Sequence, residues 1–270
     1  MKNCLIETSK ESSVHKKSEQ QINERVKLSK IEVKENMNST FESGSYRVIN
    51  FDYDFLYKDY RVIIEQVKNC LKEFCKDVKK VLVVGLGNKE VVCDSLGSRT
   101  VDKILLLGKD NDFETNTIIN GILPNVAGVT GIESFDIVVG VSKQINPDLI
   151  ICIDTLSAGI YENLFNSIQI SNTSIVPGSG VKNPRKVLSE KTLGKPILIM
   201  GIPMLISVKN LLNSFVENDV NLKEENVWLS PKDVDFAVQK FSYIFSKSIN
   251  EFFYPEIKSS QIEKYIKGIF

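Results

Sequence analysis

Two aspartates occupy positions at which a pair of carboxyl groups could do acid and base chemistry. Asp94 follows the segment VVGLGNKEVVC, in which an apolar run leads into a glycine turn, and Asp154 ends the apolar run PDLIICID. The carboxyl ends of strands in an open parallel sheet converge at one edge, so we expect these side chains to be neighbours although they lie 60 positions apart. Two carboxyl groups in a partly dry cleft do not both ionise readily. One can therefore act as an acid and the other as a base toward water, as peptide hydrolysis requires.

Both aspartates also have a purely structural interpretation. Asp94 stands directly before the helical pattern SLGSRTVDKILL, where a carboxylate can accept hydrogen bonds from the first amides of a helix. Asp154 stands where the chain is predicted to leave a strand, and capping of the following turn would account for it as well. The sequence leaves both interpretations open for each residue.

The glycine-rich segments do not match a nucleotide-binding loop. The dinucleotide fingerprint GxGxxG would need a third glycine after GLGN, and Glu90 stands there, where its charge would repel a pyrophosphate. PGSG lacks the GK[ST] ending of a P-loop and is a weak candidate for a loop that binds an anion. We expect both segments to support the substrate or a developing oxyanion through these residues: Gly85, Gly87, Asn88, Gly178, Ser179 and Gly180.

The composition argues against several other kinds of site. His15 is the only histidine, so Ser-His-Asp or Cys-His catalysis would have to recruit it from the polar N-terminal segment. The balance of 34 basic and 34 acidic residues, and the lack of an apolar run near the ~20 residues of a membrane helix, predict neither a nucleic-acid nor a membrane partner. The cysteines are scattered and odd in number, so we expect free thiols in a reducing cytoplasm: Cys4, Cys70, Cys75, Cys93 and Cys152. We expect no metal and no cofactor.

The elements that must position the aspartates follow from the apolar periodicity. Apolar runs predict buried central strands in KKVLVVGLGN, PDLIICID and KPILIMGIPM, with further strands in SYRVINF and SIQIS. Helical spacing predicts helices within residues 54–76, in ESFDIVVGVSKQI and in SVKNLLNSFV, and a short helix around residues 185–190. Ser230 and Pro231 are expected to start a C-terminal helix. The alternation of strands and helices predicts an α/β fold with three layers, α/β/α, around a mainly parallel, mixed sheet.

The chain is predicted to hold one domain and an N-terminal extension. Residues 1–45 carry alternating charges and few large apolar side chains, which indicates a mobile extension, although RVKLSKIEVKEN within it could add an edge strand. Residues 46–270 contain no repeat and no Pro-rich or Ser-rich linker, so we expect a single α/β domain there.

Read in order, the motifs resemble the germination protease family. The match lies in VLVVGLGN, DSLGSRTVDKILL, GVTGIES, INPDLIICIDTL, SIQIS, VPGSGVKNPRKVL and TLGKPILIMGIP, which span about residues 81–203. The resemblance implies a fold similar to that of hydrogenase maturation endopeptidases. It also implies an atypical acid protease whose two aspartates, in the DSLG and IDxL motifs, are Asp94 and Asp154 here. As further implications, the substrates are small acid-soluble spore proteins, the site of action is the cytoplasm of the spore core, and the assembly is a homo-oligomer.

Several positions depart from the family pattern. Val92 and Cys93 stand where a threonine and a proline are usual, and Val176 stands where the family has a histidine. The start MKNCLIETSKESS does not match the family's propeptide, so residues 1–45 are propeptide-like only in position. Two alternatives to the endopeptidase follow: a catalytically inactive relative that acts as a binding or regulatory protein, and a nucleotide-dependent enzyme. Related maturation endopeptidases place a histidine among the carboxylates at their metal, and this chain offers none there.

Overall fold

One mixed sheet organises the protein. The computed structural model describes residues 16–34, 41–54, 59–107, 113, 115–178, 186–216 and 227–268, with side chains up to residue 264. The sheet has nine strands in the order β1-β2-β3-β7-β8-β6-β4-β5, and β9 pairs with β8. The strands are β1 Lys16–Asn23, β2 Val26–Val33, β3 Gly44–Phe51, β4 Lys80–Gly85, β5 Ile118–Ile122, β6 Leu149–Ala158, β7 Ser167–Ser171, β8 Ile197–Ser207 and β9 Trp228–Leu229.

The parallel strands are confined to one part of the sheet. β5, β4, β6 and β8 run parallel to one another, whereas β1, β2, β3 and β7 form an antiparallel part that joins β8 through β7. The predicted mixed sheet is therefore confirmed, and the strands predicted from continuous apolar runs, now β4, β6 and β8, are adjacent at its centre. These three strands bring the segments with the two aspartates together.

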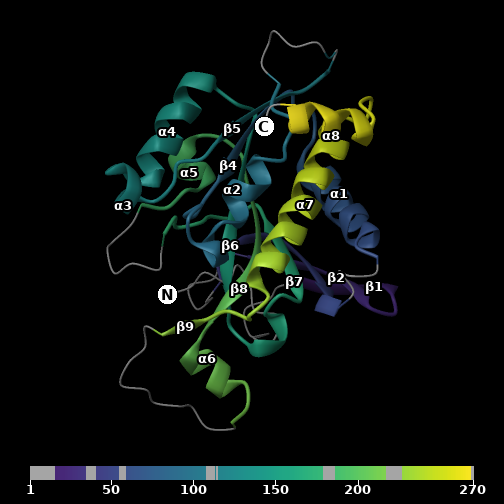
Figure 1. The fold of residues 1–270 in the computed structure, drawn as a ribbon, viewed down its shortest axis with the longest axis vertical. Coiled ribbons are helices and arrows are strands. Elements are labelled where there is room, and N and C mark those ends of the chain that lie inside the picture. The colour runs from purple at the N-terminus through teal and green to yellow at the C-terminus, as the bar shows by residue number, and fades with distance from the viewer. Residues whose placement is uncertain are drawn as a thin grey trace.

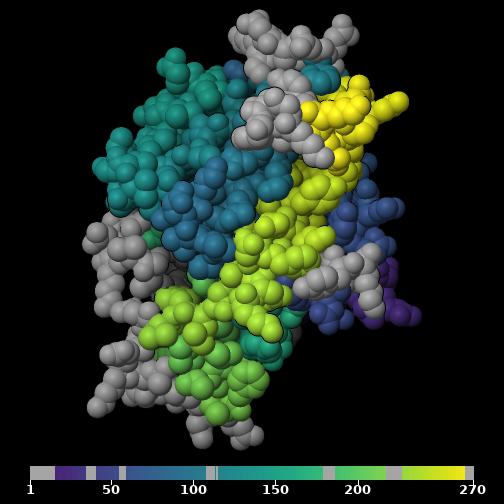
Figure 2. All heavy atoms as spheres, in the orientation of Figure 1, coloured from purple at the N-terminus to yellow at the C-terminus, as the bar shows by residue number. Residues whose placement is uncertain are grey.

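Helices cover both faces of the central strands, as predicted (Figure 1). Val81 and Val83 of β4 face a cluster with α1, α2 and α7, whereas Leu82 and Val84 face a cluster with α4 and α5. Figure 2 shows α7 crossing the molecular surface beside the segment that contains α2. The helices are α1 Arg61–Phe74, η3 Val92–Asp94, α2 Leu96–Val101, α3 Ala127–Thr130, α4 Ser134–Ile145, η4 Tyr161–Asn163, α5 Glu190–Leu193, α6 Val208–Asn213, α7 Val234–Phe253 and α8 Ser259–Gly268, η3 and η4 being 3-10 helices.

The N-terminal segment differs from the mobile extension expected over residues 1–45. Residues 16–33 form the hairpin of β1 and β2, and β2 pairs with β3 along its whole length, so the expected boundary at residue 45 falls inside β3. The physical reason is the apolar alternation of β2. Val26 and Leu28 enter the main core, and Ile31 and Val33 enter a second cluster with Tyr46 and Val48 on the other face. Residues 1–15, with Cys4 and His15, lie outside the described part.

Two helix starts differ from the predicted positions. α7 begins at Val234 after Asp233, because the Ser230 hydroxyl donates to the Met204 carbonyl oxygen at 2.9 Å instead of capping a helix. The short helix expected around residues 185–190 is α5, which Ser189 caps by accepting a hydrogen bond from the Thr192 amide. In the ranges given above, no helix has the length and apolar character needed to cross a membrane.

Candidate active site

The site begins where β4 ends and β6 continues. The pairing of β4 with β6 stops at Gly85 and Ile153, and the Leu86 amide still donates to the Ile153 carbonyl oxygen at 2.9 Å. β6 runs on to Ala158 because β8 pairs with it on the other side. The prediction that Asp154 ends its strand is therefore wrong for β6 itself. Asp154 lies instead one residue beyond the point at which its neighbour β4 stops.

The Asp154 carboxylate binds a strand amide next to a step in the sheet, the point at which β4 has ended and β6 continues. Backbone groups of alternate residues in a strand face the same neighbour, and Ile153 faces β4, so the Thr155 amide faces the position that β4 no longer fills. This amide donates to Asp154 Oδ1 at 2.8 Å. Asp154 is 7% exposed as a residue, so the bond satisfies a buried donor and draws the carboxylate toward the gap.

Asp94 reaches the same gap from the loop that follows β4. It ends η3 and is half-buried, and its Oδ2 accepts a hydrogen bond from the Asn88 amide at 2.8 Å. The carboxylate does not cap α2, whose N-cap is Ser95. The capping interpretation of Asp94 is thus wrong for the helix, and its carboxylate instead secures the turn after β4.

The turn is compatible only with glycine at position 87. Gly87 has a φ of +93°, a backbone conformation that residues with a side chain rarely adopt. A Cβ atom there would lie 2.1 Å from the backbone oxygen of Asp94 and 2.9 Å from its Oδ1. Gly87 therefore allows the turn to close over Asp94 and to aim the Asn88 amide at the carboxylate.

A second close approach holds the start of α2 against the strands. A Cβ atom on Gly97 would lie 2.4 Å from the carbonyl oxygens of Ile153 and Leu86, and one on Gly85 would lie 2.6 Å from the Gly97 carbonyl oxygen. The backbones of α2, β4 and β6 are thus in direct contact. This contact sets the position of η3, and with it Asp94, relative to β6.

The two carboxyl groups differ in their affinity for a proton. Burial raises the pKa of Asp94, although the Asn88 amide opposes this by stabilising the carboxylate. Burial raises the pKa of Asp154 well above its ordinary value, and the negative charge of Asp94 raises it further. Asp154 is therefore the partner that keeps the proton, and Asp94 is the partner that ionises first.

The remaining predicted site residues have other roles or lie outside the described part. The Leu86 and Asn88 amides are bonded to Ile153 and Asp94, so neither is free to bind an oxyanion. Support of the substrate by Gly85 and Gly87 stays a prediction. Gly178 has a left-handed φ of +63° in the loop after β7. Ser179 and Gly180 fall outside the described residues, and the role predicted for the PGSG loop stays a prediction.

Sequence reasoning missed Thr155 next to Asp154. Its hydroxyl oxygen is buried and has no hydrogen-bond partner among the described residues. The available signal was a polar residue that directly follows the apolar run and the aspartate in IICIDT.

The donor set does not fit a metal like that of the maturation endopeptidases. Within the described ranges, no group of three or more His, Cys, Asp or Glu side chains is placed to hold an ion. Cys93, beside Asp94, is a free thiol whose pKa is raised by burial and by the Asp94 charge. A cysteine in this state is a poor metal ligand, because metals bind the thiolate.

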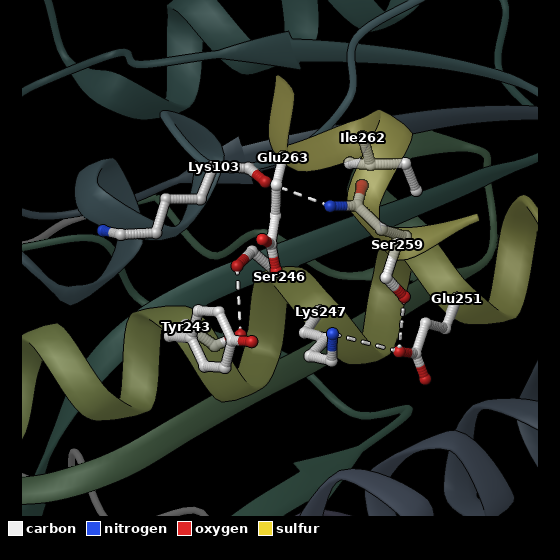
Figure 3. Close-up of a pocket in the computed structure, with 9 residues that line it drawn as sticks. Lys103, Tyr243, Ser246, Lys247, Glu251, Ser259, Ile262 and Glu263 are labelled. Atoms are coloured by element: carbon white, nitrogen blue, oxygen red, sulfur yellow. Dashed lines mark hydrogen bonds and ion pairs between the residues drawn. The ribbon is translucent and has the colours of Figure 1, made fainter. Parts of the chain in front are cut away.

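A separate cavity lies between α7 and α8. Its volume is about 470 Å³, and Lys103, from the turn after α2, forms one wall. Figure 3 shows Lys247 and Ser259 both directed at the Glu251 carboxylate, with distances of 3.3 and 3.0 Å. Neither aspartate lines this cavity, so it is distinct from the step between β4 and β6.

Comparison with known proteins agrees with the motifs. The chain is 32% identical over 255 residues to the germination protease of Clostridium tetani, a match that covers 79% of this chain and 78% of that protein. It is 41% identical over 147 residues to the germination protease of Priestia megaterium, covering 52% of this chain and 40% of that protein.

A solved structure and a family model complete the comparison. The [NiFe] hydrogenase maturation protease HycI from Thermococcus kodakarensis KOD1 overlaps 67% of this chain and 99% of its own, with a TM-score of 0.39 and 16% identity. The germination protease family model matches residues 2–220. A match over this much of the chain shows that the protein belongs to the germination protease family.

Proposed function

We propose that the protein is an endopeptidase that begins the degradation of small acid-soluble spore proteins during germination, with Asp94 and Asp154 as its acid and base. The observation that carries this proposal is the unequal pair at the step between β4 and β6: Asp154 is buried beside Asp94, whose charge raises the Asp154 pKa further. Such a pair provides one proton acceptor and one proton donor at a single site.

The unequal pair assigns a role to each carboxyl group. Asp94, as the carboxylate, takes a proton from a water molecule while the water oxygen forms a bond to the peptide carbonyl carbon, and the carbonyl electron pair moves to the oxygen. When this pair returns, the C–N bond breaks, and Asp154 donates its proton to the departing nitrogen. Transfer of the proton from Asp94 to Asp154 then restores the starting state, so protons and electrons balance over the cycle.

The test is cleavage of an acid-soluble spore protein by the purified full chain, followed on a gel. Asp94→Asn and Asp154→Asn are each expected to slow cleavage by about 10² to 10⁴-fold, since each removes one proton-transfer group. Asp136→Asn is the matched control. Among the described residues, the exposed Asp136 carboxylate forms an ion pair with Lys186 at 2.6 Å, so its loss should leave cleavage unchanged. Undiminished cleavage by both site variants would remove the aspartates from the mechanism.

The same assay separates the endopeptidase from an inactive relative. Cys93 lies directly beside Asp94 in η3, within the loop that departs from the family pattern, and this position favours the inactive relative as the second candidate. A substrate that binds in a pull-down both to the full chain and to a chain trimmed before β1, but yields no product with either, would establish the binding protein instead.

Location, assembly and activation are part of the proposal. Action in the cytoplasm of the spore core, a homo-oligomeric state and removal of an N-terminal propeptide are all inferred from the family. A propeptide that ends before β1 would be compatible with the sheet, because residues 16–33 are strands of it.

A further inference from the structure

The Thr155 hydroxyl is a buried polar group without a structural role in the described protein. The residue is 6% exposed, and Oγ1 has no hydrogen-bond partner among the described residues. Its backbone amide, by contrast, is bonded to Asp154 Oδ1 at 2.8 Å. An unpaired buried hydroxyl costs free energy relative to an apolar group of the same shape, so valine would suit this position better if folding were the only demand.

The position of Thr155 in β6 places the hydroxyl beside the candidate site. Side chains alternate along a strand, so Thr155 is on the same face as Ile151 and Ile153, which belong to the core cluster shared with α2 and α7. η3 packs against both β6 and α7 on this face. The hydroxyl is therefore on the side of β6 from which η3 brings Asp94 to the gap.

A donor is needed at this point of the site. When water adds to a peptide carbonyl, the carbonyl oxygen acquires negative charge, and hydrogen-bond donors aimed at it stabilise the transition state. In the turn after β4, the Leu86 and Asn88 amides already donate to Ile153 and Asp94. The Thr155 hydroxyl is a donor with no competing partner among the described residues.

We propose that the Thr155 hydroxyl contacts the substrate and donates a hydrogen bond to the carbonyl oxygen of the peptide bond that is cleaved. This inference rests on the proposed endopeptidase function and adds a third group to it. Asp94 accepts the proton of the attacking water, Asp154 protonates the leaving nitrogen, and Thr155 stabilises the oxygen on which charge develops.

The first arm of the test is steady-state cleavage by Thr155→Val and Thr155→Ser. Valine keeps the shape and removes the hydroxyl, so kcat should fall by about 10²-fold with little change in KM, as for the loss of one oxyanion donor. Serine keeps the hydroxyl and should retain kcat to within a few-fold. Unchanged kcat in Thr155→Val would overturn the inference while leaving the aspartate mechanism intact.

The second arm is urea unfolding, with Thr117→Val as the control. Thr117 is similarly buried, at 7% exposed, but its hydroxyl donates to the Val78 carbonyl oxygen at 3.3 Å near the start of β5. Thr117→Val should lower the unfolding midpoint and leave cleavage unchanged, whereas Thr155→Val should leave the midpoint unchanged or raise it. If Thr155→Val lowered the unfolding midpoint as the control does, the Thr155 hydroxyl would be hydrogen-bonded within the protein. This result would overturn the inference even if the wild-type chain cleaved nothing.

Discussion

The Ile153 carbonyl oxygen accepts a hydrogen bond from the Leu86 amide at 2.9 Å, and the next residue along β6 is Asp154. The bond joins the end of β4 to the middle of β6. Beyond it the chain after β4 leaves the sheet, turns at Gly87 and returns in η3 to bring Asp94 back to β6. The candidate site thus arises because β4 ends at Gly85, whereas its neighbour β6 continues to Ala158.

Gly87→Ala is expected to abolish most of the cleavage activity. The new methyl group would overlap the Asp94 backbone oxygen, and the left-handed φ of +93° adds strain of roughly 1–3 kcal/mol. The turn must open, and Asp94 then loses the Asn88 amide. Gly128→Ala in α3 is the control, because a Cβ atom there meets nothing within 4 Å. Cleavage rates and unfolding curves of both variants are to be measured, with loss of cleavage expected only in Gly87→Ala. Full activity in Gly87→Ala would contradict the close packing of the turn.

Gly97→Ala is expected to destabilise the fold by about 1–3 kcal/mol, since α2 cannot move away from two backbone carbonyl oxygens without disturbing the core. Gly140→Ala offers a sharp contrast. Gly140 is an exposed residue inside α4 with open space around its Cα, and alanine there should add about 0.5–1 kcal/mol of stability. Thermal unfolding measures both, and equal shifts of the two variants would argue against the contact between α2 and the strands.

Asp154→Asn is expected to stabilise the folded protein at neutral pH. The Asp154 pKa is raised in the folded state, so the folded protein binds this proton more tightly than the unfolded chain does, and wild-type stability falls as pH rises from the ordinary aspartate range toward the raised value. Each unit of elevation corresponds to about 1.4 kcal/mol. Asparagine carries no such cost, so its advantage should vanish below about pH 4, where aspartate is protonated in both states. Urea unfolding across this pH range would reveal the trend, and a pH-independent difference would count against it.

The pH dependence of kcat/KM is expected to be bell-shaped. Activity should rise as Asp94 loses its proton and fall as Asp154 loses its own, and both apparent pKa values should lie above the ordinary aspartate value because burial raises each. Initial rates of peptide cleavage over a pH series provide the profile. An activity that keeps rising into the alkaline range would show that no protonated carboxyl group is needed.

Removal of residues 1–15 is expected to leave the fold intact, whereas removal of residues 1–40 should unfold the protein. The longer truncation deletes β1 and β2 and exposes the surface that Val26, Leu28, Ile31 and Val33 cover. Burial of four such side chains contributes roughly 6–12 kcal/mol, which is comparable to the total stability of a domain. Circular dichroism of the two truncated chains distinguishes these outcomes, and a folded shorter chain would restore the view of residues 1–45 as a dispensable extension.

The sequence allowed the aspartate pair to be predicted, but not where each residue lies along the strands relative to the strand ends. The rule that strand ends converge holds for the sheet as a whole, and the apolar runs identified β4, β6 and β8 correctly. β6 extends past Asp154 because β8 pairs beside it, and a partner of this kind cannot be recognised from the polar residues Thr155 and Ser157. β1 was missed for a related reason, whereas β2 lies within RVKLSKIEVKEN, the segment expected to add an edge strand. β1 is largely exposed and charged, and only its pairing with β2 makes it a strand.

The contact of η3 with α7 has a consequence for synthesis on the ribosome. The chain emerges from its N-terminus, so both aspartates leave the ribosome before residues 234–253 form the helix that supports η3. Likewise β3 must wait for β7, its partner in the sheet, which is made much later. We therefore expect a growing chain to carry both carboxyl groups without the arrangement that makes them a pair.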